Sequence, residues 1–344
     1  MSPATDWSET IPEGEDAALL RLAETLRDLQ RARAKGKKAD RGLHAKSNLN
    51  VEAELTVLTD LPAHAQAGLF AKPGSYRAYV RFSNGGGKRQ GDAKPDVRGV
   101  AIKVLGVPGK KLIPGMEDET TQDFLLIRSP STPFANADDF VALVRAVSNP
   151  LLALPRVIGH FGFGRGLALL KTLSAGLGEP MTTLASTRYF SAVPIKYGPY
   201  AVHVALTPHE PRALSEDRSE NGLGDALART LRERAVTYDV QVQFYVDRDK
   251  TPIEDASVEW KESDAPFVTV GRLTLTKQDV SSARGKALGA AIEELSFDPW
   301  HALEDHRPLG NMMRARNHAY RLSTAERKAA PEPKGPLVPD PDAA

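Results

Sequence analysis

The hydrophobic positions of this chain repeat with two different periods, and the changes of period divide it into elements. From Glu15 to about Arg33 apolar residues recur every three or four positions, which predicts an amphipathic helix. After Asn50 the period becomes two, which predicts a strand with one buried face. The apolar positions of this strand are Val51, Ala53, Leu55 and Val57.

The period of two returns in later stretches, and each predicts a further strand. These stretches are 75–83, 96–105, 123–127, 200–206, 239–246 and 267–275. A mainly apolar region at 136–173, interrupted by Pro150 and Pro155, predicts a helical insertion. The total is about seven strands from distant parts of the chain. Such strands favour one antiparallel β-barrel, because closure removes exposed sheet edges.

The two ends of the chain differ from the rest in composition. Residues 1–13 are polar, and residues 329–344 are rich in Pro, Ala and Asp, so both are predicted to be disordered. No internal repeat and no clear linker divides the remainder. We therefore expect residues 14–328 to form a single domain.

Composition narrows the function classes. The 344 residues carry a net charge of +1, with 41% hydrophobic and 26% charged residues, so no overall charge points to a nucleic-acid partner. The absence of cysteine excludes disulfides, cysteine-bound zinc, iron–sulfur clusters and thiolate-bound haem. The N-terminus lacks the basic and apolar regions of a signal peptide, and no run of 18 apolar residues predicts a membrane span. A cytoplasmic protein is expected.

One candidate for chemistry lies near the C-terminus, in a stretch without Pro or Gly at 312–327 that predicts a helix. Arg316 stands four residues before Tyr320 and Arg327 seven after it, so the three share one face. Positive charge favours a phenolate, and tyrosine is one of the axial ligands of haem iron. Taken by itself, this stretch is better explained as a surface helix with two solvated arginines and a half-buried tyrosine. P-loop, HExxH and GxSxG motifs are absent.

Five segments in order resemble the haem catalases. They are Arg41-Gly-Leu-His44-Ala-Lys46, Val80-Arg81-Phe82-Ser83, Asp96-Val-Arg98-Gly99-Val-Ala101-Ile-Lys103, Leu125-Leu-Ile-Arg128, and Arg316 with Tyr320 and Arg327. Together they span most of residues 41–327. The resemblance implies an α+β fold, namely an eight-stranded antiparallel barrel of catalase type with a helical insertion and flanking helices. It also implies haem b with ferric iron.

On the distal side the resemblance makes His44 the acid–base group for peroxide cleavage and Ser83 the partner that holds its tautomer. It places Phe134 beside the haem. Without the resemblance, each residue has a structural interpretation. His44 is then a turn histidine without a ligand, Ser83 lies on the outer face of a strand, and Phe134 is a hydrophobic core residue.

On the proximal side the resemblance makes Tyr320 the iron ligand and Arg316 the partner of its phenolate. Arg41, Arg81 and Arg327 are expected to pair with the haem propionates, because a guanidinium matches a carboxylate as a fork.

The chain also departs from the family pattern. It ends soon after the proximal helix, which resembles the short catalase-related peroxidases. The family's distal asparagine falls at Thr120, with Thr121 beside it. A threonine lacks the amide donor and leaves more room, which favours organic hydroperoxides over dismutation of hydrogen peroxide.

We therefore expect a haem peroxidase that reduces organic hydroperoxides and hydrogen peroxide, has weak catalase activity and uses a small-molecule reductant. Two alternatives remain. One is a fatty-acid hydroperoxide isomerase or lyase of the allene-oxide-synthase type. The other is a non-catalytic carrier of haem or another hydrophobic ligand. The short N-terminal arm favours a monomer or a homodimer.

Overall fold

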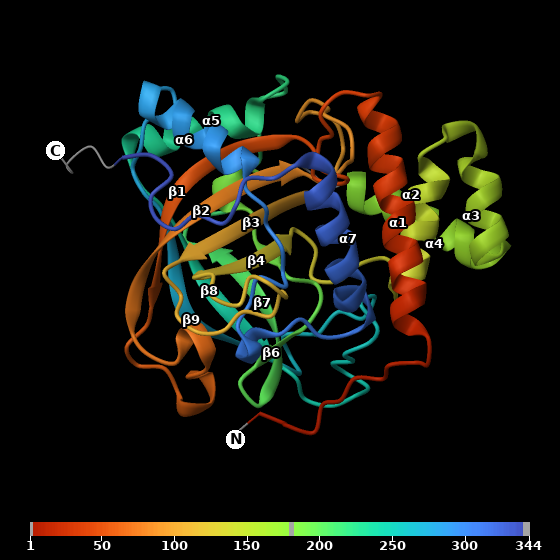
Figure 1. Cartoon of the computed structure of the whole chain (residues 1–344), viewed down its shortest axis with the longest axis horizontal. Helices are drawn as coiled ribbons and strands as arrows, with labels where there is room; N and C mark the ends of the chain where they lie inside the picture. The colour runs from red at the N-terminus through yellow and green to blue at the C-terminus, as the bar shows by residue number, and fades with distance from the viewer. Residues whose placement is uncertain (1–2, 179–181, 340–344) are drawn as a thin grey trace.

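A closed antiparallel β-barrel forms the centre of the computed structural model, which describes residues 3–178 and 182–339 (Figure 1). Its strands are β1 (Ser47–Val57), β2 (Gly74–Asn84), β3 (Arg98–Leu105), β4 (Thr121–Ile127), β5 (Tyr189–Phe190), β6 (Ile195–Tyr197), β7 (Tyr200–Pro208), β8 (Val236–Phe244) and β9 (Phe267–Leu275). They follow the order β5-β4-β3-β2-β1-β9-β8-β7-β6, and β5 also pairs with β7. This pairing closes eight strands into a barrel, with β6 attached outside the closure. The expected eight-stranded α+β barrel is confirmed.

The period of two in the sequence corresponds to the two faces of the barrel wall. In β1 the predicted apolar positions are all buried, and they belong to the main core inside the barrel. In β2 and β3, Val80 and Val100 also point into this core. Successive side chains of a strand alternate between faces, so Arg81 and Ser83 lie on the outer face of the wall. Ser83 pairs directly with Gly99 of β3.

Helices cover the outside of the barrel. They are α1 (Glu15–Ala34), α2 (Ala137–Val147), α3 (Ala153–Phe161), α4 (Phe163–Gly178), α5 (Gly222–Glu233), α6 (Ala283–Glu294) and α7 (Asn311–Arg327), with short 3-10 turns at Ala63–Ala65, Gly68–Phe70, Pro150–Leu152, Leu184–Ser186 and Glu304–His306. Figure 1 shows α7 beside the barrel, α1 outside α7, and α2 to α4 beyond α1. The predicted C-terminal helix is confirmed as α7.

The helical insertion between β4 and β5 has a small core of its own. It contains Phe134, Leu143, Val157, Phe161 and Leu169, contributed by α2, α3, α4 and the loop before them. Proline interrupts the pattern where the sequence predicted, because Pro150 begins a 3-10 turn and Pro155 lies in the first turn of α3. None of the described helices is long and apolar enough to cross a bilayer.

Each of the two terminal segments predicted to be disordered makes specific contacts at some of the residues that the structure describes; residues 1–2 and 340–344 lie outside the described residues. Near the N-terminus, the Glu9 carboxylate accepts hydrogen bonds from Arg307 (2.8 Å) and Arg314 (2.7 Å). Near the C-terminus, the buried Glu332 accepts from Lys103 Nζ (2.6 Å) and Thr121 Oγ1 (2.7 Å). Composition alone does not predict these contacts. A single carboxylate that pairs with cationic or hydroxyl donors can fix a polar segment to the rest of the fold.

Candidate functional site

The paired side chains Arg316 and Tyr320 lie on α7, where the spacing of four residues brings them together. Arg316 Nη2 donates to the Tyr320 hydroxyl oxygen at 3.0 Å. The guanidinium carbon also lies 5.2 Å from the centre of the tyrosine ring. Both side chains are only half-buried. A charge-assisted donor on the phenolic oxygen is the partner that a phenolate ligand needs.

His44 lies in the turn that leads into β1, in an unusual backbone conformation. Its φ is +53°, in the left-handed region that a non-glycine residue seldom occupies. Two backbone hydrogen bonds hold the turn, from His44 N to Gly85 O (2.9 Å) and from Ala45 N to Gly86 O (3.1 Å). The turn directs the imidazole over the outer face of β2 and β3, where its Nδ1 lies 2.9 Å from Ser83 Oγ. The predicted His44–Ser83 pair is thus present in the structure.

Gly99 makes this position of His44 sterically feasible. A β-carbon added at Gly99 would lie 2.5 Å from Cε1 and 2.9 Å from Nδ1 of His44. The imidazole therefore packs directly on the backbone of β3, and any side chain at Gly99 would displace it. The next residue of β3 that points outward is Ala101, whose side chain is also small. The barrel surface formed by β3 beside His44 is therefore flat.

His44 is held in its neutral form. Burial lowers its pKa most, and the positive charges of Arg81, Arg316 and Arg41 lower it further, to about 3. Arg316 of α7 therefore lies near enough to His44 for its charge to act on the imidazole. The tautomer in which Nδ1–H donates to Ser83 leaves the lone pair of Nε2 free to accept a proton.

Three arginines predicted to bind propionates gather beside this pair. Arg81 is buried, and its Nε and Nη2 donate to the Glu293 carboxylate at 2.8 and 3.1 Å. Arg41 Nη1 donates to the same carboxylate at 2.9 Å. Arg327 donates to the backbone oxygens of Glu294 (3.2 Å) and Leu295 at the end of α6.

Glu293 is the residue of this cluster that sequence reasoning missed. Burial raises its pKa, but Arg81 and Arg41 outweigh burial and lower it to about 2, so it is ionised. One signal was available in the sequence. Glu293 and Glu294 end α6, where the helix dipole disfavours negative charge, so cations from elsewhere in the fold must compensate them.

Thr120 lies away from His44, and Phe134 belongs to the core of the helical insertion. Thr120 is exposed and precedes β4, whereas His44 packs at Gly99, which pairs with Ile127 at the opposite end of β4. Its neighbour Thr121 is buried but donates to Glu332. Phe134 is buried in the core of the helical insertion, in an edge contact with Phe140, 5.6 Å between ring centres.

The remaining site residues fit a haem. The guanidinium groups of Arg41, Arg81 and Arg327 outnumber the two carboxylates that act on them, those of Glu293 and Glu294. The propionates of haem b carry the negative charge that suits this surplus of cations. The flat wall at Gly99 and the Tyr320 hydroxyl on the facing helix suit a planar group with an oxygen-ligated metal.

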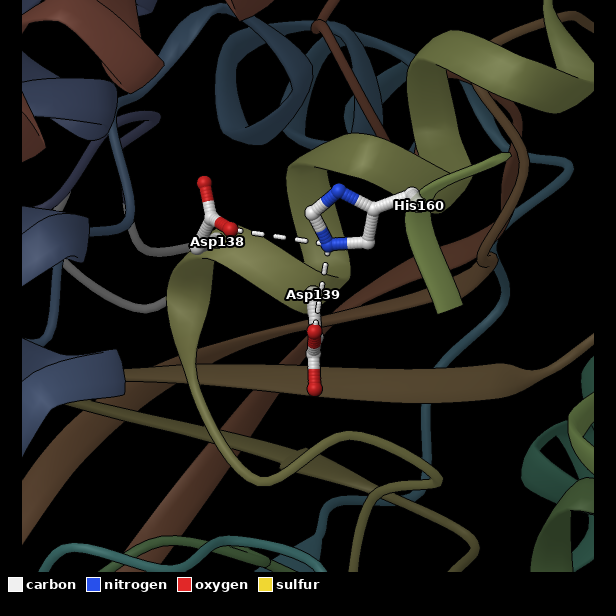
Figure 2. Close-up of side chains that lie close together, drawn as sticks. All are labelled: Asp138, Asp139 and His160. Atoms are coloured by element: carbon white, nitrogen blue, oxygen red, sulfur yellow. Dashed lines mark hydrogen bonds and ion pairs between the residues drawn. The ribbon is translucent and has the colours of Figure 1, made fainter. Parts of the chain in front are cut away.

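A separate cluster of metal-ligand type lies at the base of the helical insertion. Figure 2 shows the His160 imidazole between the carboxylates of Asp138 and Asp139, with Nε2 at 3.5 and 3.2 Å. Arg165 approaches Asp139 from another side at 3.2 Å. Ion pairing thus accounts for this arrangement, which joins α2 to α3 and α4.

Comparisons with known proteins agree with the architecture. No model of a known protein family and no curated protein sequence matches the chain. A fungal catalase structure matches with a TM-score of 0.65 and 17% identity, over 88% of this chain and 64% of that one. A bacterial catalase (0.60, 16%, 95% and 63%) and catalase A from Saccharomyces cerevisiae (0.60, 16%, 86% and 62%) also match. The chain spans less than two thirds of the length of each of these catalases. The chain therefore has the catalase fold.

Proposed function

We propose that this protein binds haem b between the outer face of the barrel and α7, and that it is a peroxidase for organic hydroperoxides and hydrogen peroxide. The observation that carries the proposal is the meeting of two pairs around one arginine cluster. His44 with Ser83 comes from the barrel side, and Arg316 with Tyr320 comes from α7. These pairs lie more than 200 residues apart in the chain, so their convergence is a property of the fold.

In this proposal Tyr320 provides the oxygen ligand to iron, and Arg316 stabilises its phenolate form. Arg41, Arg81 and Arg327 hold the two propionates. A bound haem supplies a redox-active iron at which the O–O bond of a peroxide can be cleaved.

His44 moves the proton that this cleavage requires. With haem bound, the free Nε2 of His44 would take the proton from a hydroperoxide and return it to the leaving oxygen, which would depart as alcohol or water. The complete reaction consumes one hydroperoxide, two protons and two electrons from a small-molecule reductant, and yields one alcohol and one water. Propionates on Arg81 and Arg41 would offset the charges that now depress the pKa of His44, which would make it a better base.

Thr120 does not support the preference for organic hydroperoxides, because its exposed side chain is away from His44. The preference therefore has to be measured directly. The protein is reconstituted with haem and assayed with cumene hydroperoxide and with hydrogen peroxide, each with and without a phenolic donor. Donor-dependent consumption of cumene hydroperoxide supports the peroxidase.

The same assay, repeated with a fatty-acid hydroperoxide as a third substrate, separates the alternatives. Product formed from a fatty-acid hydroperoxide without donor identifies an isomerase or lyase of the allene-oxide-synthase type. A Soret band without turnover identifies a haem carrier. A protein that takes up no haem contradicts the proposal and leaves a carrier of another hydrophobic ligand.

A further inference from the structure

The helical insertion exposes an unusual number of large apolar side chains. Among the described residues, six of the nine large hydrophobic side chains that are exposed fall between positions 147 and 167. They are Val147, Leu151, Leu152, Leu154, Phe163 and Leu167. Leu151 is 89% exposed and Phe163 70%. Scattered single exposures are ordinary, but a concentration in one short segment marks an interaction surface.

These side chains have a consistent placement on their helices. Phe163 and Leu167 are one turn apart on the same face of α4. Another face of α4 buries Leu169 in the core of the insertion. In α3, Val157 and Phe161 fill this core while Leu154 faces outward. The insertion thus fills its own core. The helices that carry the exposed apolar side chains lie beyond α1 (Figure 1).

The same segment is distinctly basic. Residues 140–178 contain four Lys or Arg residues and neither Asp nor Glu, and the acidic residues nearest to them in the sequence are Asp138, Asp139 and Glu179. Asp139, just before this segment, pairs with Arg165 at 3.2 Å. Within the described parts of the chain, Arg145, Arg156 and Lys171 form no ion pair, and all three are exposed. Lys171 continues the face of α4 that carries Phe163 and Leu167 by another turn.

We propose that the helical insertion docks the protein on an anionic lipid surface. Exposed leucine and phenylalanine next to unpaired basic residues is the pattern of helices that lie in the membrane interface. Leu151, Phe163 and Leu167 enter the boundary of the acyl chains, and the basic side chains remain at the lipid phosphates.

The charge argues against a second copy of this chain as the occupant. In a two-fold symmetric dimer the same patch meets itself, and the stretch 140–178 offers no acidic side chain to Arg145, Arg156 and Lys171 of the other copy. The lipid surface supplies the missing negative charge. Docking does not require haem, so it can succeed or fail independently of the proposed peroxidase function.

The test uses the full chain without haem and measures co-sedimentation with lipid vesicles. Wild-type protein should bind vesicles of mixed phosphatidylcholine and phosphatidylglycerol, bind pure phosphatidylcholine weakly, and be released as salt is raised. The double variant Leu151→Glu with Phe163→Glu should lower the partition coefficient about tenfold or more. Leu214→Glu is the matched control, because Leu214 is 55% exposed outside the insertion. It should bind as wild type does.

All three proteins should show the same circular dichroism spectrum, because every substituted side chain is exposed. Equal binding by the double variant and the control, or no binding of wild type to the mixed vesicles, overturns the proposal. Light scattering provides a further check. If the double variant turns a dimer into a monomer and wild type ignores vesicles, the patch joins two copies of the chain instead.

Discussion

The carboxylate of Glu293 accepts two hydrogen bonds from the buried guanidinium of Arg81, at 2.8 and 3.1 Å. Arg81 is therefore already occupied by a carboxylate of the protein itself. In the proposed function this same arginine also serves a propionate. Glu293 then has two opposed effects: it stabilises the arginine cluster in the protein without haem, and it competes for the donors that haem needs.

Glu293→Gln should separate these two effects. Without haem, unfolding should become easier by on the order of 3 kcal/mol, because a buried cation loses its charged partner. Haem should bind about tenfold more tightly, because charge-assisted donors become free. Thermal unfolding and Soret titration measure the two quantities. The control is Glu304→Gln, whose exposed carboxylate pairs with Lys196 at the surface and should change neither. Unchanged haem affinity in Glu293→Gln would show that the propionates do not use Arg81.

Tyr320→Phe should abolish or strongly weaken haem binding while the fold remains intact. The ring keeps its contact with Arg316, but the oxygen that the iron would bind is removed. Arg316→Ala is milder: haem should stay bound, and its reduction potential should fall because the phenolate loses its donor and becomes a stronger electron donor. Absorption spectra and potentiometry test both variants. An unchanged spectrum in Tyr320→Phe rules out the assignment of the ligand.

On the distal side, His44→Ala should retain haem but slow peroxide cleavage by roughly 100-fold, the usual size of a general acid–base contribution. Ser83→Ala should have a smaller effect, about tenfold, because Ser83 positions the imidazole without touching the peroxide. Stopped-flow spectroscopy with hydrogen peroxide and an alkyl hydroperoxide gives both rates. Wild-type rates in His44→Ala would favour the carrier over the enzyme.

Thr120→Asn should change nothing measurable. The side chain is exposed and lies at the end of β4 opposite to the one that pairs with Gly99 beneath His44. The ratio of oxygen release from hydrogen peroxide to reduction of cumene hydroperoxide should therefore equal that of wild type. A clear gain in oxygen release would mean that this loop reaches the distal side when haem is bound.

Acid should destabilise the fold through buried histidines away from the site. Burial lowers the pKa of His203 to about 3 and of His306 to about 4. The unfolded chain binds protons on these groups near pH 6.5 and the folded protein does not, so stability is lost as pH falls from about 6.5 towards these values. Each histidine contributes up to about 1.4 kcal/mol per pH unit.

Denaturant unfolding between pH 7 and 5 measures this dependence on pH. His203→Gln should flatten it by about one histidine's contribution, because Gln does not titrate. The control Leu214→Gln should leave the slope unchanged, because this exposed side chain carries no titratable group. Equal slopes in all three proteins would mean that His203 is protonated in the folded state.

Local features of this protein could be predicted because their geometry is set within a few residues. The Arg316–Tyr320 pair follows from a spacing of four on a helix, and that helix has no Pro or Gly to interrupt it. The faces of β1 follow from alternation, because a strand cannot place successive side chains on one side. The order of short motifs was sufficient to indicate the barrel and the pairing of His44 with Ser83.

Contacts between distant segments were decided only by the tertiary structure. Glu293 lies 212 residues from Arg81, and nothing local to either residue specifies that they meet. Thr120 illustrates the opposite error: counting positions along a motif placed it in the site, while strand pairing carried it to the far end of β4. Glu9 and Glu332 hold terminal segments that composition assigns to disorder. In each case the position of a residue depends on which distant segment it packs against, and the packing of the whole chain decides that.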